Sequence, residues 1–107
     1  MTPTLDLRED HAAILRGVLR AHLPPGARAY VFGSRVHGSA RTYSDLDLAL
    51  EWDRPLGLDI VGEIAEALSE SDLPYKVDIV DLAIVDSAFR ARIAADCIAF
   101  NTTEAGG

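Results

Sequence analysis

The stretch that decides the fold is Asp45-Leu46-Asp47-Leu48-Ala49-Leu50-Glu51-Trp52, in which apolar residues alternate with mostly polar ones. Because successive side chains of a β-strand point to opposite faces, this period of two predicts a strand with one buried face. The buried face is expected to hold Leu46, Leu48, Leu50 and Trp52. Asp45 and Asp47 then project together from the other face.

The chain before this strand is predicted to form a helix and a second strand. Apolar residues recur at helical spacing from about Leu5 to His22, and Pro24-Pro25-Gly26 ends that pattern. A run of β-formers from Arg28 to Phe32 predicts a strand, and Arg35 to Ala40 can add one or two helical turns. His11 and His22 fall on the first helix and are expected at its surface.

The chain after the strand repeats the alternation of helix and strand. We expect a loop at Pro55 and Gly57, followed by an amphipathic helix around Ile60, Val61, Ile64 and Leu68. A strand is expected over Tyr75 to Leu82. A helix over Ser87 to Asp96, with Phe89 and Ile93 inward, and a short edge strand over Cys97 to Phe100 complete the chain. This order predicts an α/β fold, a small mixed sheet with helices packed mainly on one face.

Length and composition are those of one globular domain. The 107 residues allow a single domain over 1–107, with its core at about 5–100 and a flexible tail at 102–107. No apolar run approaches the roughly 18 residues of a membrane span, and the first residues lack a secretory pattern. The lone Cys97 cannot form an internal disulfide, so a reducing, cytoplasmic location is expected.

The acidic balance of the chain argues against one class of substrate. The formal net charge is −7, and the arginines are scattered along the chain. Such a chain repels the phosphates of nucleic acid, so a long nucleic acid is not expected as the main substrate. A partner with a basic surface is compatible with this charge.

Asp45 and Asp47 are candidates for holding a divalent cation. Carboxylates two residues apart on a strand lie roughly 6 to 7 Å apart at their Cα atoms, and they repel each other unless a cation sits between them. Mg²⁺ takes oxygen ligands, commonly one or two carboxylates together with substrate phosphates. The plain alternative for such a pair is a solvated strand face.

Two further features turn this pair into a candidate active site. Gly33-Ser34 follows a predicted strand where the chain turns, and glycine allows close backbone approach while exposed N–H groups favour a phosphate. Asp78 lies inside an apolar strand, opposite Val77 and Ile79, where a charged residue rarely serves packing. A neighbouring strand would bring it to Asp45 and Asp47. Three carboxylates can hold two metal ions for nucleotidyl transfer.

Asp81 is a weaker candidate, because it falls on the other face of the strand and is expected to cap the following turn.

The motif set resembles that of the DNA polymerase β-like nucleotidyltransferases. In that superfamily Gly-Ser is followed by ten residues and then Asp-x-Asp, and the segment from Gly33 to Asp47 has this spacing. The segment from Tyr75 to Asp81 resembles the family's third-carboxylate strand. The single small domain resembles the minimal nucleotidyltransferase (MNT) antitoxins, which pair with helical HEPN toxins.

The resemblance implies roles for individual residues. Gly33 and Ser34 would hold the β- and γ-phosphates of ATP, and the three aspartates would ligate two Mg²⁺ ions. Asp78 would also accept the proton of the attacking hydroxyl. Arg35 would contact phosphate or form a salt bridge, and Ser44 would shape the turn or support a triphosphate oxygen. His37 is unassigned, and Tyr43 is expected to shape the same turn.

The function implied by the resemblance is an antitoxin that transfers AMP from ATP to a partner protein, at a tyrosine of a HEPN toxin. Two other functions stay open: a binding module that neutralises its partner by contact alone, and a small-molecule nucleotidyltransferase of the aminoglycoside-modifying kind. Association with a second copy of the chain also stays open.

Overall fold

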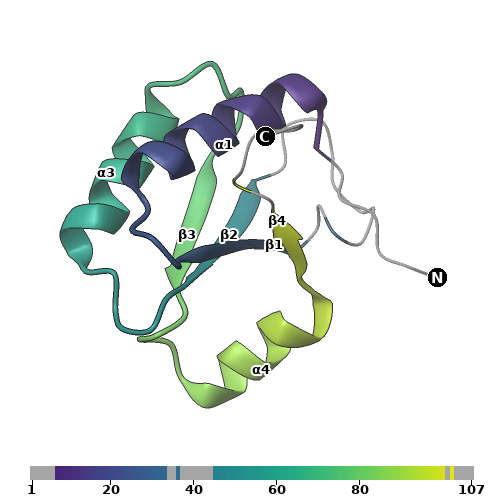
Figure 1. Cartoon of the computed structure of the whole chain (residues 1–107). Coiled ribbons are helices and arrows are strands. Elements are labelled where there is room, and N and C mark those ends of the chain that lie inside the picture. Colours follow the sequence, from purple (N-terminus) through teal and green to yellow (C-terminus); the bar gives the residue numbers. More distant parts are fainter. Residues whose placement is uncertain (1–6, 34–35, 37–44, 101, 103–107) are drawn as a thin grey trace.

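The alternating segment forms the strand β2 inside a mixed sheet (Figure 1). The computed structural model describes residues 7–33, 36, 45–100 and 102. Within these residues the helices are α1 (Glu9–His22), α3 (Leu58–Ser69) and α4 (Ser87–Asp96), and the strands are β1 (Arg28–Phe32), β2 (Leu46–Glu51), β3 (Val77–Asp81) and β4 (Ile98–Phe100). The predicted α/β fold is confirmed.

The strands lie in the order β3-β2-β1-β4. β1 pairs antiparallel with both β2 and β4, whereas β2 and β3 run parallel. Parallel neighbours need a long crossover, which α3 supplies between β2 and β3. The sheet is therefore mixed, with β4 as the short edge strand that the sequence predicts.

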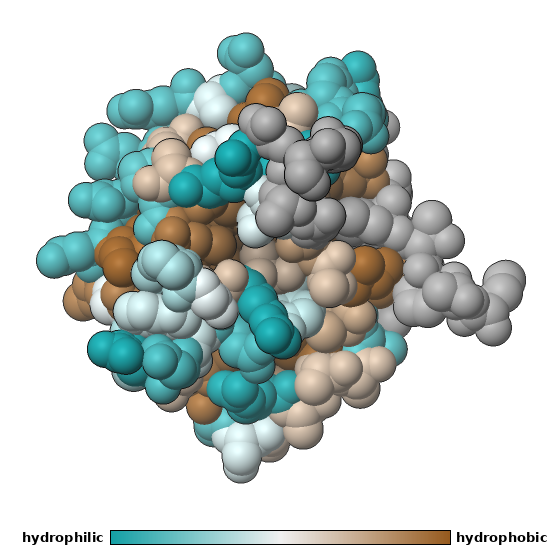
Figure 2. All heavy atoms as spheres, in the orientation of Figure 1, coloured by the Kyte–Doolittle hydropathy of each residue, from teal (hydrophilic) through white to brown (hydrophobic). Residues whose placement is uncertain are grey.

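One face of the sheet carries the main core. Leu46, Leu48 and Leu50 of β2 are each 0 % exposed and pack beneath α1 and α3. Ile64 and Leu68 of α3 are buried against them, as the helical spacing predicts. Figure 2 shows hydrophilic side chains on the outer sides of these helices. The leucines thus form the buried face that the period of two predicts, while Ala49 on the other face is buried as well.

The opposite face is covered in part by α4. Ala49, Leu82 and Ile93 are buried there, and Phe89 packs beside them. In Figure 1 this helix lies on the side of the sheet away from α1 and α3. Helices therefore lie mainly, but not only, on one face. Asp86 caps α4, since its Oδ1 accepts a hydrogen bond from the Phe89 amide at 2.8 Å.

The predicted start of the first helix is too early. The helix begins at Glu9, because Arg8 is extended with φ −63° and ψ 149°. Glu9 and Asp10 place negative charge in the first turn, where the helix dipole favours it. Leu7 contacts the core without being helical. Leu5 and residues 103–107 of the predicted tail lie outside the described residues.

The two histidines of α1 are partly exposed at the surface, as expected, and each has a partner. His11 Nδ1 lies 3.2 Å from the Tyr75 hydroxyl, and the two rings meet edge to face. His22 Nδ1 lies 3.6 Å from a carboxylate oxygen of Glu63 on α3. Because α1 packs across α3 and the start of β3, residues on its flanks gain partners that helical spacing alone does not reveal.

Asp81 is buried and joins two loops to the end of β3. Its Oδ2 accepts a hydrogen bond from the Leu56 amide at 2.9 Å, and its Oδ1 accepts one from the Ala83 amide at 3.0 Å. Only 7 % of this residue is exposed. The expected capping role is confirmed, and the bond to Leu56 adds a contact distant in sequence. Among the described helices, none has the length and apolar character to cross a membrane.

We predict that Asp81→Ala lowers the free energy of unfolding by roughly 2–4 kcal/mol, because the buried Leu56 amide and the part-buried Ala83 amide lose a charged acceptor. Urea denaturation of both proteins measures this difference. Asp72→Ala, which removes an exposed carboxylate shortly before β3, is the control and should stay within about 0.5 kcal/mol of the wild type. An Asp81→Ala variant as stable as this control would contradict the role of Asp81.

Candidate functional site

The chain turns sharply where β1 ends. Gly33 follows Phe32 with φ 82°, in the left-handed region that favours glycine. The Gly33 carbonyl accepts a hydrogen bond from the Val36 amide at 3.0 Å, and Val36 is buried in the main core. The turn is therefore fixed from both sides, by the strand before it and by a buried side chain after it.

The backbone of Gly33 lies directly against the carboxylate of Asp47. A Cβ atom added at Gly33 would collide with Oδ2 of Asp47. Phe32 and Asp47 are register partners in the antiparallel pair β1–β2, which explains this closeness. Glycine is thus required here for its φ value and also for its missing side chain.

A second carboxylate lies on the other side of Asp47. Asp47 and Asp78 are register partners in the parallel pair β2–β3, so their side chains share one face. Asp45 immediately precedes β2 and is exposed, two residues from Asp47. The structure thus places Asp47 and Asp78 in direct register, with Asp45 ahead of them.

The electrostatics of this cluster are unfavourable without a cation. Burial raises the pKa of Asp47, and the charges of Asp78 and Asp45 raise this pKa further. Lys76 offers partial compensation, since its Nζ lies 3.3 Å from Oδ1 of Asp78. Both side chains of that pair are well exposed, so the ion pair stabilises weakly. Asp47 keeps a charge that no described hydrogen bond or ion pair balances.

The donor set fits a cation that takes only part of its ligands from protein. Within the described residues, no three His, Cys, Asp or Glu side chains are arranged so that they could hold a metal ion. Mg²⁺ is commonly held by one or two carboxylates, with the rest of its shell from phosphates and water. The adjacent carboxylates of Asp47 and Asp78 match that requirement.

Several predicted site residues lie outside the described part of the chain. These are Ser34, Arg35, His37, Tyr43 and Ser44. The geometry therefore rests on Gly33, Asp45, Asp47 and Asp78.

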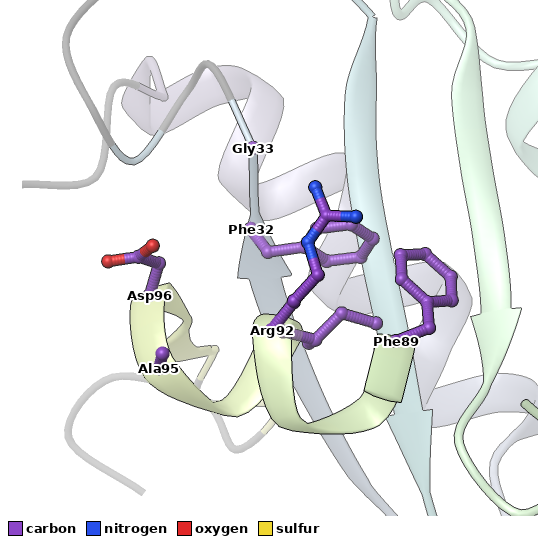
Figure 3. Close-up of a pocket in the computed structure, with 7 residues that line it drawn as sticks. Phe32, Gly33, Phe89, Arg92, Ala95 and Asp96 are labelled. Carbon is purple, nitrogen blue, oxygen red and sulfur yellow. The ribbon is translucent and has the colours of Figure 1, made fainter. Parts of the chain in front are cut away.

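A pocket that sequence reasoning missed opens beside this cluster (Figure 3). Its volume is about 390 Å³, and its walls include Phe32 and Gly33 from the sheet and Phe89, Arg92, Ile93 and Asp96 from α4. The alternation in β1 places Phe32 on the Asp47 face, which is a signal in the sequence. No local pattern shows that α4 packs on that same face.

Known proteins match the chain over most of its length. The family described as polymerase beta nucleotidyltransferases matches residues 22–102. A probable protein adenylyltransferase, MntA of Haemophilus influenzae, is 43% identical over 86 residues, which are 80% of this chain and 75% of that protein.

Solved structures share the fold. A chain of a toxin-antitoxin complex with AMP-PNP is 26% identical, with a TM-score of 0.73 over 87% of this chain and 74% of that one. A chain of the Shewanella oneidensis complex between an MNT antitoxin and a tri-AMPylated HEPN toxin is 24% identical. The TM-score is 0.61, over 86% of this chain and 73% of that one, and this likeness shows the fold alone.

We predict that Asp47→Asn stabilises the metal-free domain at neutral pH. Because the pKa of Asp47 is raised in the folded chain, the folded state binds this proton more tightly than the unfolded state. The contribution of Asp47 to stability therefore falls as pH rises through the window above its ordinary pKa of 3.8. The difference between variant and wild type should be small near about pH 4 and larger near about pH 7.

Urea denaturation with a chelator, at several pH values, measures this difference. Asp72→Asn is the control for removing one negative charge. A less stable Asp47→Asn variant at neutral pH would contradict the uncompensated cluster.

We predict that Gly33→Ala destabilises the domain by at least about 1 kcal/mol, because alanine is strained at this φ value and its Cβ meets Asp47. Thermal denaturation checks this value against Gly62→Ala. Gly62 lies in α3 with open space around it, so alanine there should stabilise by up to about 1 kcal/mol. In an Asp47→Ala background the cost of Gly33→Ala should fall, and an unchanged cost would exclude the collision.

Proposed function

Because the chain belongs to the polymerase beta nucleotidyltransferase family, we propose that it transfers AMP from ATP to a hydroxyl group of a partner protein. The partner is a HEPN-type toxin, and the chain is the antitoxin of a HEPN/MNT pair. The similarity to MntA and to a toxin-antitoxin complex with AMP-PNP supports this proposal. We place the reaction in the cytoplasm, in keeping with the single free Cys97.

The observation that carries the proposal is the contact between the Gly33 backbone and the Asp47 carboxylate, with Asp78 in register beside it. Glycine allows a phosphate to approach the backbone at the very point where carboxylates gather. A carboxylate face alone would repel a triphosphate. The combination of phosphate turn and acidic face therefore suits a metal-bound nucleotide better than either a free anion or a free cation.

In the proposed step, the acceptor oxygen forms a bond to the α-phosphorus of ATP. The bond between the α-phosphorus and the bridging oxygen to the β-phosphorus breaks, and pyrophosphate leaves with that oxygen. Asp78 accepts the proton of the hydroxyl. Holding the acceptor and ATP together removes much of the entropic barrier.

We assign Asp45, Asp47 and Asp78 as the ligands of two Mg²⁺ ions. Bound Mg²⁺ would neutralise charge that develops on the phosphates. Asp47, whose pKa is raised by burial and by its neighbours, becomes more acidic when a cation is bound. Ser34 is assigned to the β- and γ-phosphates together with Gly33, and Arg35 and Ser44 are assigned to the triphosphate.

The acceptor side of the reaction concerns the partner. Asp47 and Asp78 share one face of the sheet, where a second protein would present its hydroxyl to the bound nucleotide. The net charge of −7 favours a partner with a basic docking surface, so association should slow as salt rises.

Two other functions give different outcomes in the same experiment. A non-catalytic binding module would form a tight complex with the toxin and add no mass to it. A small-molecule nucleotidyltransferase would place AMP on an aminoglycoside-like compound. The acidic cluster disfavours the first function, because uncompensated carboxylates are costly to keep without a use.

We predict that incubation with the HEPN partner, ATP and Mg²⁺ adds an AMP-sized mass to the partner, as measured by mass spectrometry. Asp47→Asn should slow this transfer at least about 100-fold while remaining folded. Asp72→Asn is the matched control and should transfer at the wild-type rate. A chelator should abolish the reaction. A stable complex in which no mass is ever added would replace this function with the binding module.

A further inference from the structure

Lys76 lies at the start of β3, directly across from the start of β2. Leu46 and Val77 are register partners in the parallel pair of these strands, and the Leu46 amide donates to the Lys76 carbonyl at 2.9 Å. One residue before this pair, the two chain segments carry Asp45 and Lys76. The ladder therefore begins with a carboxylate and an ammonium group on neighbouring segments.

Four charged side chains share one face of the sheet at this point. Asp45 and Asp47 lie two residues apart along one segment, and their side chains therefore point to the same face. Lys76 and Asp78 lie two residues apart along the other segment in the same way. Neighbouring strands are about 4.8 Å apart, so the four groups are close neighbours. Three of them are carboxylates, and the fourth is the only lysine of the chain.

The lysine already pairs with one of the carboxylates. Its Nζ lies 3.3 Å from Oδ1 of Asp78, and 74 % of the lysine side chain is exposed. Within the described residues, this is the one ion pair that any of the three carboxylates makes. An ion pair this exposed adds little to the stability of the fold. The ammonium group does occupy an oxygen through which Asp78 would bind a metal ion.

We propose that Lys76 makes the site selective for a metal-bound nucleotide over a bare divalent cation. This inference rests on the proposed transfer function and deepens it. Without a nucleotide, the ammonium group of Lys76 competes with a divalent cation for Asp78 and repels that cation. When a triphosphate arrives with its metal, the same ammonium group attracts the phosphates, which keep a net negative charge with one Mg²⁺ bound.

The chemistry of lysine suits this exchange of partners. The ammonium group is a compact point charge on a flexible stem, so it can leave a carboxylate oxygen for a phosphate oxygen. Arginine would hold the carboxylate of Asp78 through a planar fork and would exchange partners less readily. The exposure of the Lys76 side chain gives it room to move. Lys76 is therefore a specificity-determining residue in this arrangement.

The test measures two ligands on the full chain carrying Lys76→Gln. Mn²⁺, which takes the same oxygen ligands as Mg²⁺, is titrated alone, and the free ion is counted by electron paramagnetic resonance. ATP is titrated by calorimetry with Mg²⁺ present. We expect the variant to bind Mn²⁺ roughly three- to tenfold more tightly and ATP at least about threefold more weakly, because one positive charge leaves the site. A residue that only supports the fold would not shift the two ligands in opposite directions.

Two control variants separate the charge of Lys76 from its place in the fold. Lys76→Arg keeps the positive charge and should bind Mn²⁺ no more tightly than the wild type. Arg28→Gln removes an exposed positive charge at the other end of β1, where Arg28 pairs in register with Glu51. This distant change should leave the binding of both ligands within about twofold of the wild type, because salt screens exposed charges beyond about 10 Å.

The proposal is overturned if Lys76→Gln leaves the binding of either ligand unchanged, or if it weakens both. The first result would make the ion pair an ordinary surface contact, and the second would give Lys76 a structural role in the site. In both cases a wild-type chain that binds ATP keeps the proposed transfer. A wild-type chain that binds neither Mn²⁺ nor ATP would remove the transfer function and this inference together.

Discussion

The contact between the Gly33 backbone and the Asp47 carboxylate is the constraint on which the site depends. It requires a residue without a Cβ atom at the end of β1, and it requires β1 and β2 to pair in one register. A slip by one residue would turn Asp47 toward the core and Leu46 or Leu48 toward solvent. The burial of the leucines therefore fixes the position of the carboxylate relative to the phosphate turn.

One face of β2 stabilises the fold, and the other carries the candidate site. Leu46, Leu48 and Leu50 are fully buried, and each contributes about 1.5–3 kcal/mol by leaving water. On the other face, the ionised form of Asp47 is destabilised, since burial and two neighbouring charges raise the pKa of this residue. A strong core on one side thus tolerates a destabilising cluster on the other, which is a common arrangement at functional sites.

The attachment of α4 leaves the carboxylate end of the sheet open. Arg90 ties the helix to Glu51, and the Tyr30 hydroxyl donates to the same carboxylate at 3.1 Å. Glu51 lies at the opposite end of β2 from Asp47, roughly 13 Å along the strand. Near its other end the helix is followed by β4, which pairs with Val31 of β1. The pocket lies between α4 and the Phe32–Gly33 end of β1.

The sequence by itself determined the elements and the candidate carboxylates. Period-two alternation places Leu48 and Asp47 on opposite faces of any strand they form, so the core face and the acidic face follow from local geometry. The predicted bounds of β1 and α4 agree with the structure, whereas the predicted starts of α1 and β3 are too early. Only the tertiary structure decided that Asp78 is the register partner of Asp47, that Asp81 binds the Leu56 amide, and that α4 brings Arg92 to the acidic face. These contacts join segments that are distant in the chain. Their energy comes from side-chain packing and strand pairing between those segments, which a local sequence pattern does not predict.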